Sequence, residues 1–153
     1  MVRLTPGEKA PDFTLPDQDG RPVRLMDLQG SKVLLYFYAR AGTSGCTRQA
    51  VSVRDAIPEL RSYGVQAIGV SPDRPEALKK FFDKQSLNFT LLSDADRVVA
   101  KTYGAFGEKT MYGKKVEGII RSVFLIDEQG IIRGAFYKIS PEDTVPKAMD
   151  VLK

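Results

Sequence analysis

The chain has 153 residues, of which 42% are hydrophobic and 27% are charged, and its formal net charge is +4. This composition predicts a single domain over residues 1–153 with a full hydrophobic core, and it excludes wholesale disorder. The longest apolar run, residues 33–39, is much shorter than the roughly 20 residues of a membrane-spanning helix, so we expect no membrane partner. The positive charge is modest and dispersed, so we expect no nucleic-acid partner either.

Two residue counts narrow the chemistry that the chain can perform. It contains no histidine and a single cysteine, Cys46. Without histidine, Cys/His zinc sites and Ser-His-Asp or Cys-His nucleophile systems are excluded within this chain. One thiol cannot form an intrachain disulfide, which favours a reducing, cytoplasmic location. Any reaction must therefore use this thiol together with carboxylates, hydroxyls, arginine or lysine.

The first half of the chain predicts a hairpin followed by alternating strands and helices. The expected elements, in chain order, are strands over 13–15, 22–25 and 33–38, a helix over 46–63, a strand over 65–70 and a helix over 75–85. An Asp-Gly turn within residues 17–20 joins the first two strands. The β-branched and aromatic run over 33–38 is typical of a strand buried on both faces. Pro58 predicts a kink or a break in the first helix.

The second half continues this alternation and ends in a second hairpin and a helix. Its expected elements are a strand over 89–92, a helix over 95–103, strands over 122–126 and 131–137, and a last helix that starts at Ser140. Residues 104–118 are polar and contain glycine, and they predict a loop of about 15 residues, long enough to have a functional role. Phe106, Met111 and Tyr112 in this loop are candidates for an apolar wall beside a substrate, or for core residues.

The order of elements predicts the fold class. Helices that alternate with buried strands cover the faces of a sheet, whereas the last two strands must pair antiparallel because a short turn joins them. We therefore expect an α/β protein in the form of a three-layer α/β/α sandwich, with a mixed central sheet and an N-terminal β-hairpin. This arrangement resembles the thioredoxin fold.

Cys46 occupies a position that favours a reactive thiol. It follows the first buried strand and a glycine-rich turn, and it lies at the start of the next helix. Unpaired backbone N–H groups and the positive end of the helix dipole stabilise an anion at such a position, and they lower a thiol pKa from about 8.5 towards about 3.5–7.5. The alternative is that Cys46 is a small buried hydrophobic residue, as lone cysteines often are.

Two polar residues near Cys46 are candidates for the same site. The residue three before it is Thr43, so the pattern is Thr-x-x-Cys and a local dithiol pair is impossible. The Thr43 hydroxyl is suited to orient a polar substrate beside the sulfur, or to cap the helix, and both roles are compatible. Gln49 lies almost one helical turn after Cys46. It is either a residue that reaches an arginine across the site or a plain exposed helix residue.

Several stretches in order give the chain a resemblance to the peroxiredoxins, most closely to the bacterioferritin-comigratory (peroxiredoxin Q) subfamily. The subfamily pattern Pro-x-x-x-Thr-x-x-Cys is similar to the segment that ends at Cys46. The stretches that carry the resemblance are residues 39–46, 7–13, 69–73, 91–94, 107–109, 111–115 and 121–127. Each match alone is weak, but together they extend over almost the whole chain.

This resemblance implies roles for four residues. Cys46 matches the peroxidatic cysteine, whose thiolate attacks a hydroperoxide, and Thr43 matches the threonine whose hydroxyl holds the peroxide. Arg121 matches the arginine that reaches the site from a later strand, and Gln49 resembles the side chain that positions it. Without the resemblance, Arg121 reads as a solvated charge at the end of a strand.

Two positions depart from the family pattern. Ala39 stands where the signature has proline, and the loss of that ring predicts a freer turn, weaker protection of the sulfur and a reduced rate. Val51 stands where many subfamily members have a resolving cysteine. The chain therefore cannot complete a two-cysteine cycle by itself.

The resemblance implies a one-cysteine thiol peroxidase that reduces hydrogen peroxide and organic hydroperoxides. Cys46 passes through a sulfenic acid, and an external thiol such as thioredoxin reduces it. No metal or organic cofactor is implied, and the expected state is a monomer or a weak homodimer. The alternatives are a redox-sensing or chaperone-like binding protein with little turnover, or an engineered variant of a two-cysteine peroxiredoxin.

Overall fold

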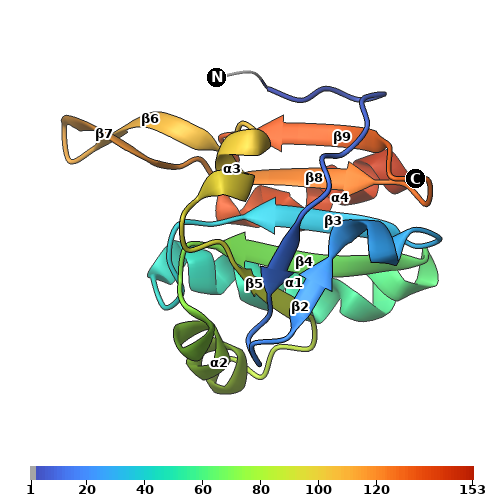
Figure 1. Ribbon diagram of the computed structural model, residues 1–153, viewed down its shortest axis with the longest axis horizontal. Helices are drawn as coiled ribbons and strands as arrows, with labels where there is room; N and C mark the ends of the chain where they lie inside the picture. Colours follow the sequence, from blue (N-terminus) through green and yellow to red (C-terminus); the bar gives the residue numbers. More distant parts are fainter. Residues whose placement is uncertain (1–2) are drawn as a thin grey trace.

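The computed structural model describes residues 3–153, except for the side chain of Met111. A five-stranded mixed sheet runs through the centre of the molecule in the order β5-β4-β3-β8-β9 (Figure 1). Its strands are β3 (Lys32–Phe37), β4 (Val65–Ser71), β5 (Thr90–Ser93), β8 (Ser122–Ile126) and β9 (Ile132–Tyr137). Strands β3, β4 and β5 are parallel, whereas β8 pairs antiparallel with both β3 and β9. The mixed sheet expected from the sequence is thereby confirmed.

The apolar run in β3 is explained by its central place in this sheet. Alternate side chains of a strand point to opposite faces, so a strand covered on both faces needs apolar residues throughout. Leu34 and Tyr36 belong to the hydrophobic cluster on one face, whereas Leu35 and Phe37 belong to the cluster on the other. All four side chains are fully buried.

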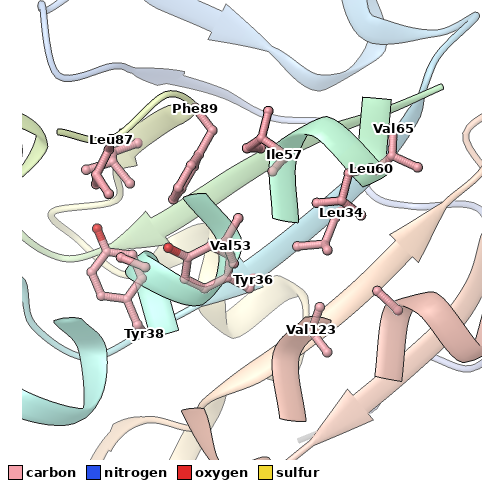
Figure 2. Packing of buried hydrophobic residues seen from close by; sticks show 14 of the residues in the cluster. Leu34, Tyr36, Tyr38, Val53, Ile57, Leu60, Val65, Leu87, Phe89 and Val123 are labelled. Carbon is pink, nitrogen blue, oxygen red and sulfur yellow. The ribbon is translucent and has the colours of Figure 1, made fainter. Parts of the chain in front are cut away.

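Three helices cover the first face of the sheet. They are α1 (Ser44–Ser62), α2 (Pro75–Lys84) and α4 (Thr144–Leu152), and a 3₁₀ turn, η2 (Pro141–Asp143), precedes the last. Figure 2 shows Val53 of α1 beside Tyr36 and Tyr38, and Ile57 of the same helix farther along, near Phe89. The helical spacing of these apolar residues places them on one face of α1, towards the sheet.

The second face is covered by the N-terminal hairpin and a short helix. Strands β1 (Thr14–Pro16) and β2 (Pro22–Arg24) pair antiparallel, and η1 (Leu25–Leu28) and α3 (Val98–Thr102) complete this layer. The expected hairpin and the three-layer α/β/α arrangement are both confirmed. Among residues 3–153, no helix is long and apolar enough to cross a membrane.

The prediction of a loop over residues 104–118 is wrong, because this segment forms a β-hairpin. Strands β6 (Phe106–Met111) and β7 (Lys114–Ile119) pair in register and extend away from the central sheet (Figure 1). Tyr112 and Gly113 form its turn with φ values of 53° and 77°, the left-handed backbone of a two-residue hairpin turn. The polar composition hid these strands because both faces of the hairpin are largely solvated. Tyr112 is 98% exposed at the tip of the hairpin and does not line a substrate site. Phe106 packs against the hydrophobic cluster on the second face of the sheet.

The break expected at Pro58 does not occur, because α1 is one helix from Ser44 to Ser62. A proline inside a helix cannot donate to the carbonyl four residues earlier, which here belongs to Arg54. The side-chain amide of Asn88 donates to that carbonyl at 3.3 Å. A neighbouring segment thus supplies a hydrogen bond where Pro58 removes one.

Two helices begin later than expected. Helix α3 starts at Val98, because Arg97 before it has a left-handed backbone with φ of 64°. The Asp94 carboxylate accepts the N–H groups of Val99 and Ala100 in its first turn, at 3.2 and 2.9 Å. Near the C-terminus, the segment after Ser140 first forms the 3₁₀ turn, and α4 follows from Thr144.

Gly69 is required where β4 passes Tyr36. The two residues are paired across β3 and β4, and a Cβ at Gly69 would lie 2.8 Å from Cζ and 2.9 Å from the hydroxyl of Tyr36. We expect Gly69→Ala to lower the free energy of unfolding by about 1–3 kcal/mol because the core is overpacked. In a Tyr36→Phe background the loss should be smaller. Urea unfolding measures both, and equal losses in the two backgrounds would contradict this explanation.

Candidate active site

Cys46 lies in the first turn of α1, where that helix begins after the end of β3. Helix α1 has 19 residues, and Cys46 is its third. The free N–H groups at this end, together with the helix dipole, favour a negative charge on the sulfur. The thiol is free and only 2% exposed. A sulfur in this position is screened from bulk water and faces fixed backbone donors.

A carboxylate from the end of β4 holds the turn before the helix. Asp73 Oδ2 accepts the backbone N–H of Ala41 at 2.7 Å and the hydroxyl of Ser71 at 2.8 Å. The hydroxyl of Ser93, at the end of β5, donates to the Asp73 carbonyl at 2.6 Å. The sequence Ser71-Pro72-Asp73 before α2 is typical of a helix cap, but no side chain caps α2. Asp73 instead ties the turn that carries Cys46 to two strands.

Arg121 reaches the sulfur from the segment just before β8. Its Nη2 lies 3.5 Å from Cys46 Sγ. Gly45 leaves room for this approach, because a Cβ there would lie 3.3 Å from Arg121 Nη2. The structure therefore brings together the cysteine and the arginine that the sequence placed 75 residues apart.

A buried hydrogen-bond chain fixes Arg121. Gln49 is fully buried, and its Oε1 accepts Arg121 Nη1 at 2.5 Å, so the alternative of an exposed helix residue is wrong. Gln49 Nε2 donates to Thr144 Oγ1 at 2.8 Å, and the Thr144 hydroxyl donates to the Pro141 carbonyl at 3.2 Å. Each donor in this chain thus meets an acceptor. We define Arg121, Gln49 and Thr144 as the relay.

Thr144 was not identified from the sequence. It lies 95 residues from Gln49, and a threonine near a helix start has the ordinary meaning of a capping residue. Here it is fully buried at the first position of α4, and its hydroxyl serves Gln49. Its full burial depends on how α4 packs against α1, so local sequence carries no signal for it.

Thr43 stands beside the sulfur without capping the helix. It has the extended backbone of an N-cap residue, but its side chain makes no capping hydrogen bond. Its hydroxyl donates to the Arg40 carbonyl at 3.0 Å. The same hydroxyl also lowers the pKa of the Cys46 thiol. Of the two roles expected from the sequence, the side-chain cap is not formed, and the role in orienting a substrate stays a prediction.

Opposing effects act on the pKa of Cys46, and the net result is a lowered value. Burial is the largest single effect and raises the pKa, because it disfavours the charged form. The Thr43 hydroxyl, the backbone at Arg40 and the nearby Arg121 guanidinium each lower it. Together these groups outweigh burial, so the thiolate is favoured relative to an ordinary cysteine.

The two positions that depart from the family pattern lie in different environments. Ala39 is exposed in the turn after β3 and borders a cavity together with Arg121. Val51 is half-buried on α1, beyond Gln49. Neither residue has a thiol that could react with an oxidised Cys46. Because Cys46 is the only cysteine of the sequence, no other side chain of the chain can form a disulfide with it.

This fold and site define a class: a thioredoxin-fold protein with one activated thiol at a helix N-terminus. The sequence model of the AhpC/TSA family matches residues 6–135. The chain is 51% identical to peroxiredoxin Bcp of Escherichia coli over 136 residues, which is 89% of this chain and 87% of that protein. The chain belongs to the AhpC/TSA family, among the Bcp peroxiredoxins, and it is a thiol-dependent peroxidase with a single cysteine.

Solved structures agree with this assignment. Peroxidoxin BcpB of Mycobacterium tuberculosis superposes with a TM-score of 0.87 at 32% identity, covering 98% of this chain and 97% of that one. The bacterioferritin comigratory protein of Xanthomonas campestris superposes with a TM-score of 0.85 at 30% identity, covering 92% and 89%. The peroxiredoxin fold expected from the resemblance is therefore confirmed.

The relay predicts an effect of Thr144 on the distant thiol. In Thr144→Val the side-chain amide of Gln49 loses its acceptor, which should loosen Arg121 and raise the pKa of Cys46. The rate of iodoacetamide alkylation, measured against pH, should then rise at higher pH than in the parent protein. Thr144→Ser keeps the hydroxyl and should retain the parent profile. A profile in Thr144→Val that matches the parent would exclude this role.

Proposed function

We propose that Cys46 is the peroxidatic cysteine and that the protein reduces hydrogen peroxide and organic hydroperoxides. The observation that carries this proposal is the 3.5 Å contact between Arg121 and a thiol whose pKa is lowered. The related bacterioferritin comigratory protein of Xanthomonas campestris has alkyl peroxide reduction activity, which supports organic hydroperoxides as substrates here.

The first chemical step oxidises the sulfur. The Cys46 thiolate attacks the terminal oxygen of ROOH, an S–O bond forms, and the O–O bond breaks. The leaving RO⁻ takes up a proton and departs as ROH, and the sulfur becomes a sulfenic acid. Negative charge moves from sulfur to the leaving oxygen, and the Arg121 guanidinium beside it stabilises that charge. Gln49 is a positioning residue, because it acts through Arg121.

Thr43 is suited to hold the peroxide. Its hydroxyl has one proton to donate and two lone pairs that accept. In the resting site that proton goes to the Arg40 carbonyl. When a peroxide binds, the hydroxyl oxygen of Thr43 can accept a hydrogen bond from the O–H group of the peroxide. The oxygen that is attacked then faces the sulfur. This places Thr43 on the substrate side and Arg121 on the charge-stabilising side of Cys46.

Reduction of the sulfenic acid requires a thiol from outside the chain, because Val51 stands where two-cysteine relatives have the resolving cysteine. One external thiol condenses with the Cys46 sulfenic acid to a mixed disulfide and releases water. A second thiol then attacks this disulfide and returns Cys46 to the thiol form. Thioredoxin or another thiol reductant is the proposed partner.

We infer that the 153-residue chain acts as one domain, as a monomer or a weak homodimer, in the cytoplasm. Among the described side chains, three large apolar ones are exposed, namely Val98, Tyr112 and Val116, which is too little for an extensive stable interface. A thiol that must be reduced in each cycle favours a reducing compartment. No metal, organic cofactor or nucleic acid enters the proposed cycle.

The alternatives raised by Ala39 and Val51 are not favoured. A redox sensor or a chaperone-like binding protein with little turnover has weaker support, because the relatives are peroxiredoxins and the activated thiol has its full set of neighbours. An altered two-cysteine enzyme would need the same Cys46 chemistry for its first step.

Removing the charge of Arg121 tests the proposal. Arg121→Met should slow Cys46 oxidation by hydrogen peroxide about 100-fold or more, because a fixed donor to the developing charge is lost. It should also shift the rise of rate with pH to higher pH, because the pKa of Cys46 increases and less thiolate is present at a given pH. Stopped-flow oxidation from pH 4 to 9 measures both effects.

Arg61→Met, in the last turn of α1, removes the same charge far from Cys46 and serves as the matched control. Its oxidation rate and pH profile should equal those of the parent. The proposal fails if the parent Cys46 reacts no faster than free cysteine, or if Arg61→Met and Arg121→Met lose activity equally.

The missing partner thiol predicts sensitivity to excess peroxide. Without reductant, the sulfenic acid of Cys46 should persist and progress to sulfinic and sulfonic acids. Intact-mass spectrometry after graded peroxide should show stepwise addition of one, two and three oxygen atoms. A disulfide-linked dimer as the sole product would contradict this expectation.

A further inference from the structure

A cavity beside the proposed site is lined by positively charged side chains. It has a volume of about 400 Å³ and lies between the β6–β7 hairpin, the residues after β9 and the turn that leads to α1. Its lining residues are Ala39, Lys109, Thr110, Ile119, Ile120, Arg121, Lys138 and Ile139. Three of these are cations and none is acidic.

The two lysines of this cavity, Lys109 and Lys138, are not neutralised by the protein. Within residues 3–153, no ion pair includes Lys109, Arg121 or Lys138. Lys109 Nζ donates one hydrogen bond to the Ile119 carbonyl at 3.0 Å, and its remaining protons stay available. Arg121 is held by Gln49, a neutral group. Two lysines without an ion pair, together with the Arg121 guanidinium beside Cys46, attract a small anion to this cavity.

The size and the apolar lining indicate an organic anion. A volume of about 400 Å³ falls within the range of small-molecule sites, roughly 300–1,000 Å³, and far exceeds what hydrogen peroxide needs. Ile119, Ile120 and Ile139 offer apolar contact, and Ala39 borders the cavity with a side chain smaller than the proline of the family pattern. A carboxylate at the cations with a short carbon chain along the isoleucines matches this lining.

Arg121 connects the cavity to the sulfur, because it both lines the cavity and contacts Cys46 Sγ. Cys46 is only 2% exposed, so any thiol reaches its sulfur only after the site opens, and a thiol held beside Arg121 is already next to that sulfur. A small thiol can enter the cavity, and the chain has no second cysteine of its own. The position of the cavity next to the sulfur and the absence of a second cysteine therefore favour a small thiol as its occupant.

We propose that this cavity binds the carboxylate of a small acidic thiol, and that this thiol reduces the Cys46 sulfenic acid. This inference rests on the proposed function. The bound RSH forms an S–S bond with Cys46, and the sulfenic hydroxyl leaves as water with the thiol proton. A second RSH attacks the mixed disulfide, which gives RSSR and restores the Cys46 thiol. The sulfur of Cys46 is reduced, and the two thiols are oxidised.

The test compares two thiols that differ in charge, 3-mercaptopropionate and 3-mercapto-1-propanol. Cys46 is first oxidised with one equivalent of hydrogen peroxide, and the rate of sulfenic acid loss is then measured for each thiol. The ratio of the two rate constants cancels most of the intrinsic reactivity. We expect Lys138→Met to lower this ratio about threefold, and added salt to lower it in the parent protein. Lys138→Arg should keep the parent ratio.

Lys114→Met is the matched control, because it removes the same charge on the exposed hairpin strand β7, away from the cavity lining. Its ratio should equal the parent ratio. The proposal is wrong if Lys138→Met leaves the ratio unchanged, or if Lys114→Met changes it as much. If sulfenic acid does not form at all in the parent, the proposed function fails before the cavity is tested.

A third arm asks whether the cavity serves the peroxide instead. Oxidation rates are measured with a carboxylate-bearing hydroperoxide and with tert-butyl hydroperoxide in the parent and in Lys138→Met. An effect of Lys138→Met on the carboxylate-bearing hydroperoxide alone, with no effect on the thiol ratio, would assign the cavity to substrate and overturn the reductant site. An effect confined to the thiol ratio supports it.

Discussion

The contact between the Arg121 guanidinium and the Cys46 sulfur is the interaction on which the rest of the site depends. The sulfur is almost completely buried, and burial by itself would keep the thiol protonated. The Thr43 hydroxyl, the backbone at Arg40 in the turn before the helix and the Arg121 cation reverse this effect, and the pKa of Cys46 is lowered. A cation can do this only if it stays in place, which explains why its other nitrogen is bound to a fully buried Gln49.

The surrounding fold supports this contact from several directions. Strand β3 leads into the turn, Asp73 after β4 accepts hydrogen bonds from that turn, and Ser93 at the end of β5 holds Asp73. The carboxyl ends of parallel strands meet at one edge of a sheet, so three separate segments converge there. Helix α4 contributes Thr144, whose hydroxyl accepts a hydrogen bond from Gln49. The site is therefore built on the ends of rigid elements, and its loop is tied at defined atoms.

The burial of the sulfur has opposite effects on the two halves of the catalytic cycle, oxidation by the peroxide and reduction by an external thiol. Exclusion of water favours the charge transfer from sulfur to the peroxide oxygen, because electrostatic interactions are stronger in a site of low dielectric. The same enclosure restricts the thiol that must follow. The cationic cavity lined by Arg121 offers a small reductant a binding place next to the sulfur, and Ala39 at its border has a smaller side chain than proline.

The sequence alone determined the order of the elements, the buried central strand and the position of Cys46 at a helix start, because these follow from local periodicity and turn residues. It did not reveal the β6–β7 hairpin, whose solvated faces leave no apolar alternation. Nor did it reveal the uninterrupted helix at Pro58, where Asn88 from another segment donates to the Arg54 carbonyl. Only the tertiary structure decided that Gln49 is buried, that Asp73 serves the turn before α1, and that Thr144 completes the relay. These contacts join residues 32 to 95 positions apart, and such pairs form through strand register and helix packing, which no local pattern encodes.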